Sequence, residues 1–243
     1  MIDLEVDRGL AVITIDRPHA RNAIALATMG ELEKALDAAA GAAALVVRGA
    51  GDRAFVSGGD LKELAAIRTE DEATGMALRM RGFCDRLAAF PTPVIAALNG
   101  HALGGGAEVA VAADIRVAAD DITIGFNQTT LAIMPAWGGA ERLAALVGRG
   151  RALLLAGTGT LLDAAEAQRV GLVDQVLPRA SFDDGWRSLA RSLATGPARE
   201  IKNIMTGTVP PHEAARAFAR LWVADEHWDA ADRLTHRNKN ARQ

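Results

Sequence analysis

Two glycine-bearing segments of this sequence could supply backbone donors for a negative charge. Residues 54–62 contain a Gly-Gly pair and residues 99–108 contain a Gly-Gly-Gly run, and each segment follows a predicted strand and begins a predicted helix. Amides at a helix start have no intrahelical acceptor, so two such starts that face each other would suit a developing oxyanion. Taken singly, either segment is also compatible with a tight turn or close packing.

One carboxylate stands in apolar surroundings. Glu108 lies in the run 107–113, whose other members are all alanine or valine. A solvated helix face does not explain it, because its neighbours within one turn are apolar. Glu108 is therefore either a proton-transfer residue in a pocket or a buried, hydrogen-bonded structural glutamate.

Several other catalytic signatures fail at a required position. The segment 212–216 (His-Glu-Ala-Ala-Arg) lacks the second histidine of a zinc-protease helix, and Val109 replaces the last glycine of a dinucleotide-binding loop. The sequence has no Gly-Lys-Ser/Thr phosphate loop and no serine in a Gly-x-Ser-x-Gly elbow. These failures argue against a metal centre, a Rossmann enzyme, an NTPase and a serine hydrolase.

The composition is that of an ordinary globular protein. Half of the 243 residues are hydrophobic, and a formal net charge of -3 with scattered lysine and arginine does not favour nucleic acid as a partner. The lone Cys84 cannot pair within the chain, the N-terminus shows no leader, and no stretch approaches the ~20 apolar residues of a membrane span. We expect a cytoplasmic protein without a membrane anchor or a bound metal.

Hydrophobic periodicity predicts an α/β protein in which strands and helices alternate. A hairpin is expected over 2–7 and 10–16, and further strands at 44–49, 94–98, 115–118, 122–124 and 172–177. Helices are expected near 28–40, 73–90, 104–113, 139–147, 150–156 and 163–170. Strand signals stop at Ser181, so we expect a core over 1–180 and a helical region over 181–243.

A long amphipathic helix is predicted over 212–239 within the helical region. Large apolar side chains recur there at roughly helical spacing, namely Phe218, Leu221, Trp222, Trp228 and Leu234. Such a stripe packs either on its own domain or on another subunit.

Taken together, the motifs resemble the crotonase (enoyl-CoA hydratase/isomerase) superfamily from end to end. The matching segments are Arg17-Pro18 with Asn22-Ala23, then 55–62, 99–108 and 135–139 (Pro-Ala-Trp-Gly-Gly), in the family's order and spacing. The resemblance implies a ClpP/crotonase-like spiral of strand–strand–helix units, and a helical C-terminal region that assembles trimers or dimers of trimers. It also implies an acyl-CoA substrate, with CoA as part of the thioester and no separate cofactor.

The resemblance also assigns site residues. The amides of Gly59 and Gly105 would form an oxyanion hole, and Glu108 would be the first catalytic glutamate and point into the pocket. Residues on the CoA moiety would be Asp60, Leu61 and Lys62 around the adenine and Arg21 near the phosphates.

Gln128 falls where family hydratases carry their second glutamate. Shifting the alignment does not restore an acid, because no carboxylate lies between Asp121 and Glu141. A neutral amide can orient water or a carbonyl but cannot exchange a proton near neutral pH, so hydration would lose acid–base help worth about 10²–10⁴-fold. Efficient hydration is therefore not expected.

The segment 135–139, with Trp137, is similar to that of ethylmalonyl-CoA decarboxylase-like members, which also lack the second glutamate. Loss of CO₂ generates an enolate directly, so an oxyanion hole and one acid suffice. We expect an acyl-CoA lyase or isomerase that uses Glu108 as its single acid/base, with Gln128 and Trp137 as substrate contacts, and in sharper form a decarboxylase of small 2-carboxyacyl-CoA esters. A weak enoyl-CoA hydratase and a non-catalytic acyl-CoA-binding protein are the alternatives.

Overall fold

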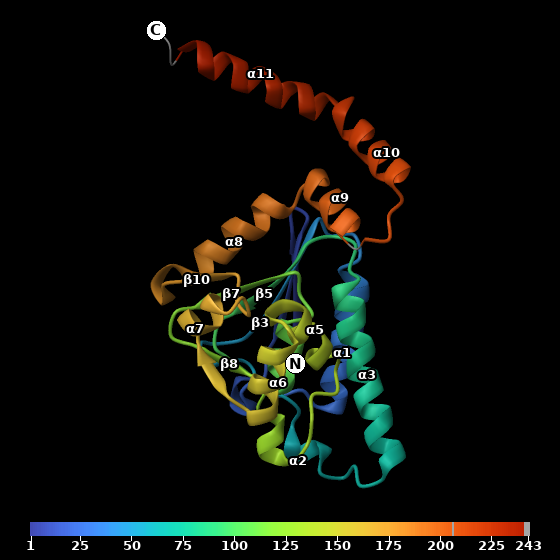
Figure 1. Cartoon of the computed structure of the whole chain (residues 1–243), viewed down its shortest axis with the longest axis vertical. Helices are drawn as coiled ribbons and strands as arrows, with labels where there is room; N and C mark the ends of the chain where they lie inside the picture. The colour runs from blue at the N-terminus through green and yellow to red at the C-terminus, as the bar shows by residue number, and fades with distance from the viewer. Residues whose placement is uncertain (206, 241–243) are drawn as a thin grey trace. The chain divides into compact units, whose positions relative to one another are not determined.

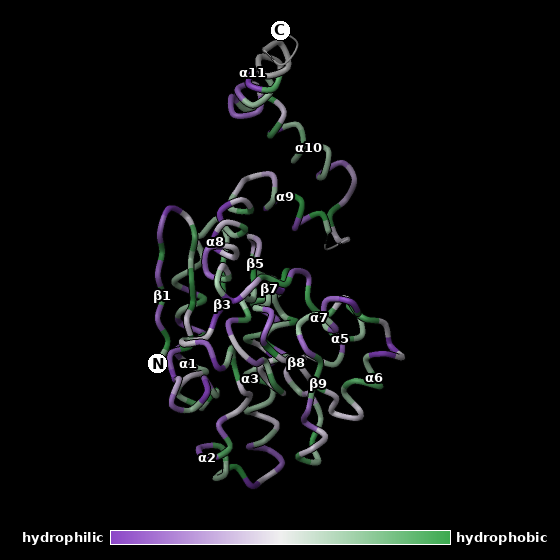
Figure 2. The backbone as a smooth tube through the Cα atoms, turned by 90° about the vertical axis from the view of Figure 1, so that its left-hand side faces the viewer, coloured by the Kyte–Doolittle hydropathy of each residue, from purple (hydrophilic) through white to green (hydrophobic). Residues whose placement is uncertain are grey.

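Six strands form the larger of two sheets in the computed structural model, which describes residues 1–205 and 207–240, with side chains through residue 234 (Figure 1). In sheet order they are β1 (Ile2–Asp7), β2 (Leu10–Ile15), β3 (Ala44–Gly49), β5 (Val94–Leu98), β7 (Ile115–Ala119) and β10 (Gln175–Leu177). The antiparallel pair β1–β2 confirms the predicted hairpin, whose turn residues Arg8 and Gly9 both have positive φ. The alternation of polar and apolar residues along β1 can be followed in Figure 2.

A second sheet contains four strands of three residues each. Its order is β4 (Ala54–Val56), β6 (His101–Leu103), β8 (Thr123–Gly125) and β9 (Leu161–Asp163). Of these, only the strand expected at 122–124 was predicted, since three residues are too few for an alternating pattern. A strand of the large sheet, a strand of the small sheet and a helix follow one another repeatedly, which confirms the predicted strand–strand–helix units.

Two helices lie side by side, α1 (Leu26–Ala38) and α3 (Glu70–Ala88), and α1 also contacts β1 and β2 of the large sheet. Thr69 and Glu72 form a capping box at the start of α3, which ends shortly before a Pro91 that could not continue it. The helix buries Met80, Phe83, Cys84 and Leu87, the i, i+3, i+4, i+7 pattern of an amphipathic helix. Both helices confirm the sequence prediction to within a few residues.

Shorter helices connect the strands. They are α2 (Leu61–Leu64), α4 (Gly105–Ala110), α5 (Gly139–Val147), α6 (Arg149–Thr158), α7 (Ala164–Arg169), and the 3-10 turns η1 (Pro18–Ala20), η2 (Asn127–Leu131) and η3 (Arg179–Ser181). Across the described residues we find no helix with the length and apolar character needed to cross a bilayer.

The chain separates into two units, Met1–Ala194 and Thr195–Gln243. The helix α8 (Phe182–Leu193) belongs to the first unit although it lies beyond residue 180, where the sequence becomes all-helical. It contacts β3 and β7, and its Phe182, Trp186 and Ala190 are almost completely buried. The boundary therefore follows the core and not the change in composition.

Trp186→Ala should lower the free energy of unfolding of the first unit by about 3–5 kcal/mol, because it empties a fully buried site. Chemical denaturation followed by circular dichroism measures this loss. The matched control is Trp222→Ala, whose side chain is 47% exposed and belongs to the second unit, so that its loss should change the unfolding of the first unit far less. Equal losses in the two variants would contradict the assignment of α8 to the core.

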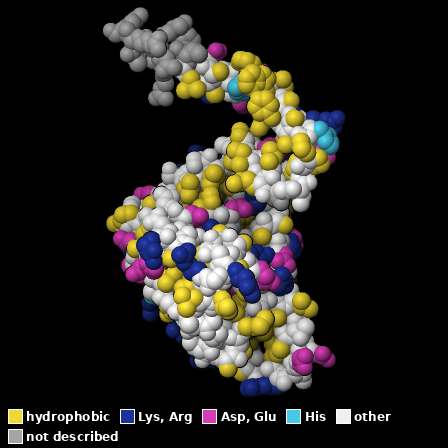
Figure 3. Space-filling model, viewed as in Figure 1, with side chains coloured by type: hydrophobic (Ala, Val, Ile, Leu, Met, Phe, Trp, Pro, Cys, Tyr) yellow, Lys and Arg dark blue, Asp and Glu magenta, His cyan; other side chains and the backbone are white. Residues whose placement is uncertain are grey.

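The second unit contains α9 (Gly196–Met205), α10 (Pro211–Trp222) and α11 (Asp225–Asn240). The prediction of one helix over 212–239 is wrong, because residues 223–224 interrupt it. The Trp222 ring packs against Phe218 within α10 and against Trp228 across this break, each at a centroid distance of 5.6 Å. All three side chains stay about half exposed, and hydrophobic atoms are conspicuous on these helices in Figure 3. Residues 206 and 241–243 of the predicted helical region lie outside the described residues.

Candidate functional site

The two glycine-bearing segments meet because their strands are parallel neighbours. β4 pairs with β6, so the chain leaves both strands at the same edge of the small sheet. A Cβ atom placed on Gly58 would lie 3.4 Å from the amide nitrogen of Gly105. The fold therefore brings together two loops that are more than forty residues apart in sequence.

The backbone of residues 58–60 is held by Ile24. The Ile24 amide donates to the Gly58 carbonyl (2.8 Å), and the Asp60 amide donates to the Ile24 carbonyl (2.9 Å). The intervening Gly59 amide has no acceptor among the described residues, and neither does the amide of Gly105, the first residue of α4. Two fixed segments thus each present an unused N–H, as an oxyanion hole requires.

Close packing explains two glycines of the second loop. A Cβ atom on Gly106 would lie 1.8 Å from the Val56 carbonyl oxygen, and one on Gly105 would lie 2.2 Å from Cζ3 of Trp137. Trp137 is 6% exposed, so its indole belongs to the core and at the same time forms the wall behind Gly105. Both glycines are required by the approach of neighbouring groups.

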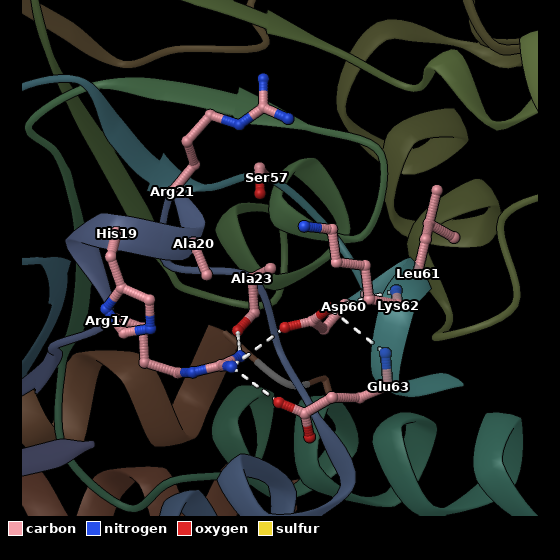
Figure 4. A pocket seen from close by; sticks show the side chains of 11 residues that line it. Arg17, His19, Ala20, Arg21, Ala23, Ser57, Asp60, Leu61, Lys62 and Glu63 are labelled. Atoms are coloured by element: carbon pink, nitrogen blue, oxygen red, sulfur yellow. Dashed lines mark hydrogen bonds and ion pairs between the residues drawn. The ribbon is translucent and has the colours of Figure 1, made fainter. Parts of the chain in front are cut away.

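A cavity of about 480 Å³ opens beside Gly59 (Figure 4). The lining includes the predicted CoA residues Arg21, Asp60, Leu61 and Lys62, which come from the turn after η1 and from the start of α2. Within the described part of the chain, Arg21 and Lys62 form no ion pair, so two cationic side chains are available for an anionic ligand. The cavity thus has the charge that phosphate groups favour.

The carboxylate of Glu108 is buried and accepts four N–H groups. Its Oε1 accepts from Nε2 of Gln128 (2.9 Å) and from the amide of Ala136 (3.3 Å), and its Oε2 accepts from the amides of Trp137 (2.7 Å) and Gly139 (2.9 Å). Three of these donors belong to the segment that leads into α5. Glu108 does not line the cavity beside Gly59, and its orientation toward the acyl group of a substrate stays a prediction.

Two effects oppose each other at Glu108. Burial raises its pKa, and hydrogen bonds from the amides of Gly139, Trp137 and Ala136 and from Gln128 lower it, with a net rise above the ordinary value. A raised pKa brings a carboxyl group closer to the neutral range, where a proton-transfer residue works best.

The sequence matches the family model described as "Enoyl-CoA hydratase/isomerase" over residues 5–221. The chain belongs to this family. A probable enoyl-CoA hydratase of Bacillus subtilis (strain 168) is 39% identical over 175 residues, which cover 71% of this chain and 67% of that protein. A short-chain-enoyl-CoA hydratase of Clostridium acetobutylicum is 35% identical over 202 residues, 82% of this chain and 77% of that protein.

The crystal structure of an enoyl-CoA hydratase from Bacillus anthracis has the same fold. Its TM-score is 0.87 at 31% sequence identity, and the match covers 97% of this chain and 96% of that one. These likenesses confirm the crotonase-like fold and the membership of the enoyl-CoA hydratase/isomerase family that the motifs predicted.

The predicted site residues of this family member fall into two groups. Five of them line the cavity, namely Arg21, Gly59, Asp60, Leu61 and Lys62. Four lie at or next to the buried carboxylate: Glu108 itself, Gln128 and Trp137, which donate to it, and Gly105, which packs against the Trp137 ring. The contact between Gly58 and Gly105 joins the two groups, while the roles of the nine residues stay predictions.

Arg17 is a residue whose part in the site the sequence did not reveal. Its guanidinium is nearly buried and donates to the carbonyl of Ala23 (2.6 Å) and to the carboxylates of Asp60 (3.0 Å) and Glu63 (2.8 Å), as the dashed lines in Figure 4 show. Asp60 in turn caps α2 by accepting from the amides of Lys62 and Glu63. Arg17 thereby fixes Asp60, the residue that directly follows Gly59. In the sequence, the Arg17-Pro18 motif was the feature that pointed to this arginine.

Two asparagines of the family motifs form hydrogen bonds to the backbone between β3 and β4. The Asn22 side chain accepts from the amide of Arg17 and donates to the carbonyls of Ala50 and Ala54. Asn99 accepts from the amide of Gly49 and donates to the carbonyls of Gly51 and Ala54. Both side-chain amides thus hold Ala54, the first residue of β4, one from a segment that precedes the strand in sequence and one from a segment that follows it.

Asp60 should make stability depend on pH in the acid range. Burial raises its pKa, but the Arg17 guanidinium and the amides of Glu63 and Lys62 together hold it below the ordinary value. The stabilisation of the folded state by ionised Asp60 is therefore complete above the unfolded pKa of about 3.9. It is lost as the pH falls through the lower pKa that Asp60 has in the folded state. Melting temperatures between pH 7 and pH 3 should fall less steeply for Asp60→Asn than for the wild type. Asp3→Asn, on exposed β1, should follow the wild type, and a parallel decline of all three proteins would refute the prediction.

Proposed function

We propose that this chain is an acyl-CoA enzyme that forms a thioester enolate and decarboxylates a small 2-carboxyacyl-CoA. The proposal rests on the hydrogen bond that the Gln128 side chain donates to Glu108. Where the hydratases of the family would need a second acid, the Gln128 amide lies 2.9 Å from the Glu108 carboxylate. Glu141, the next carboxylate along the chain, forms an ion pair with Arg81 (2.7 Å) instead.

The proposed reaction needs one proton donor. The bond between C2 and the carboxylate breaks, its electron pair forms the enolate of the thioester, and CO₂ leaves. The amides of Gly59 and Gly105 stabilise the enolate oxygen, and Glu108 delivers a proton to C2 and regains one from solvent. The net reaction consumes one proton and yields CO₂ and the shortened acyl-CoA.

The cavity beside Gly59 supports CoA as the carrier. Arg21 would contact its phosphates, and Asp60, Leu61 and Lys62 would frame the adenine, with CoA entering as part of the substrate and no further cofactor. We also propose that the half-exposed aromatic side chains of α10 and α11 assemble the chain into a trimer or a dimer of trimers.

Incubation with crotonyl-CoA, methylmalonyl-CoA and ethylmalonyl-CoA, followed by mass spectrometry, tests the proposal. We expect CO₂ release from one or both carboxylated esters and little addition of water to crotonyl-CoA. Efficient hydration without CO₂ release would instead identify an enoyl-CoA hydratase that does not need a second carboxylate. Tight binding of all three esters without turnover would identify an acyl-CoA-binding protein, an alternative favoured by the four N–H groups that already occupy Glu108.

A further inference from the structure

The amide of Gln128 has one satisfied and one unsatisfied end. The side chain is 7% exposed, and its Nε2 donates to Oε1 of Glu108. Its own Oε1 is buried and finds no hydrogen-bond partner among the described residues. A buried acceptor without a donor is unfavourable, so this end of the amide should be open to a new partner.

The orientation of this amide depends on the charge of Glu108. An ionised carboxylate can only accept, so the amide must turn its NH₂ group toward it. A protonated carboxyl has an O–H that donates, so the amide can reverse and present its carbonyl oxygen instead. The reversal leaves Nε2, a donor, where the unsatisfied acceptor was.

We propose that Gln128 is a positioning and specificity-determining residue whose amide reverses when Glu108 takes up a proton, so that its free NH₂ group binds the 2-carboxylate of the substrate. The inference rests on the proposed decarboxylation and specifies how the same site recognises its substrate class. An ionised Glu108 leaves a free carbonyl oxygen, which repels a carboxylate. A protonated Glu108 leaves a free donor and holds the proton that the enolate will need.

The contacts of Glu108 indicate which oxygen takes part. Oε2 accepts two short hydrogen bonds from the amides of Trp137 (2.7 Å) and Gly139 (2.9 Å). Oε1 is held by the Gln128 side chain, which can rotate, and by the more distant amide of Ala136 (3.3 Å). Protonation at Oε1 therefore disturbs the backbone least.

Among the described residues, few other charged groups face this carboxylate. From α3, Arg81 and Cys84 interact with it electrostatically, and burial raises the pKa of the Cys84 thiol to about 12. From α5, Arg142 donates to the carbonyls of Trp137 and Gly138, and Glu141 pairs with Arg81. Among these groups Glu108 is the one that the Gln128 amide contacts, so a proton on Glu108 decides how that amide is oriented.

Two stable ligands isolate the effect of the carboxylate. The thioethers S-(2-carboxyethyl)-CoA and S-propyl-CoA have the same chain length and cannot react, and only the first carries the charge. Calorimetric titration at pH 7 in two buffers of different ionisation enthalpy gives the number of protons taken up on binding. Any protonation caused by the CoA moiety is common to both ligands and cancels in the difference.

We expect the wild type to take up close to one more proton with the carboxyethyl ligand than with the propyl ligand. Gln128→Met should abolish this difference and weaken the carboxyethyl ligand by about tenfold, as expected for loss of a hydrogen bond to a charged group. Affinity for the propyl ligand should not change. Gln128→Leu serves the same purpose if the methionine variant does not fold, and Gln168→Met, on exposed α7, should behave as the wild type.

Equal proton uptake with the two ligands in the wild type, or a difference that survives in Gln128→Met, would overturn the inference. If the same protein releases CO₂ from methylmalonyl-CoA, the proposed function stands and the Gln128 switch alone fails. If neither thioether binds, the acyl-CoA function fails and the inference fails with it.

Discussion

Glu108→Gln should lower the rate of CO₂ release by about 10²–10⁴-fold, the contribution of a positioned proton-transfer group. The variant keeps the shape of the side chain but removes the proton that the enolate must receive. Binding of CoA thioesters should change little, because Glu108 does not line the cavity that is proposed to hold CoA. Single-turnover measurement of CO₂ release, together with calorimetric binding of S-propyl-CoA, checks both expectations.

Glutamine is the appropriate replacement because alanine would damage the structure. Glu108→Ala leaves the amides of Ala136, Trp137 and Gly139 without an acceptor, at about 1–3 kcal/mol for each. A glutamine at position 108 keeps an oxygen for the amides of Trp137 and Gly139, and its NH₂ group can face Gln128, whose amide reverses to accept it, so that only the longer bond from Ala136 is lost. Glu141→Gln, at an exposed ion pair, is the matched control and should retain full activity. Unchanged turnover in Glu108→Gln would remove Glu108 from the chemistry and leave it a structural residue.

Gly105→Ala should lower turnover by about 10²–10³-fold, the loss expected for one oxyanion donor. The added methyl group would lie 2.2 Å from Cζ3 and 2.4 Å from Cη2 of Trp137, so either the indole or the start of α4 must shift. Either movement displaces the amide from the position of the enolate oxygen. The expected signature is a fall in kcat with binding of S-propyl-CoA retained.

The same substitution elsewhere separates this effect from a general loss of stability. Gly82 lies in the middle of α3, and a Cβ atom there meets nothing within 4 Å. Gly82→Ala should therefore stabilise the helix by about 0.5–1 kcal/mol and leave turnover unchanged. A Gly105→Ala variant with wild-type kcat would show that this amide does not contact the reacting oxygen.

The elements that could be predicted are those with a long enough local pattern. The helix over Glu70–Ala88 has a capping residue and a regular apolar stripe, and the strand Ala44–Gly49 is apolar over its first four residues. The strands β4, β6 and β9 have three residues each and form because neighbouring segments pair with them. Such tertiary pairing leaves almost no trace in the local sequence.

The site was predictable as a list of residues and not as an arrangement. The motifs identified Gly59, Gly105 and Glu108, but the four N–H groups on Glu108 come from segments twenty or more residues away. The burial of Arg17 against Asp60 and Glu63 likewise depends on the fold. An arginine next to a proline does not by itself predict a buried ion pair.

The anchoring of residues 136–139 by Glu108 has an evolutionary consequence. A residue that serves both the reaction and the fold remains under selection after the reaction is lost, since its removal would release the loop and unfold its surroundings. A descendant that had become a mere carrier of acyl-CoA would keep this glutamate as faithfully as an active enzyme. Its presence in a relative is therefore poor evidence for turnover, and such relatives must be distinguished by assay.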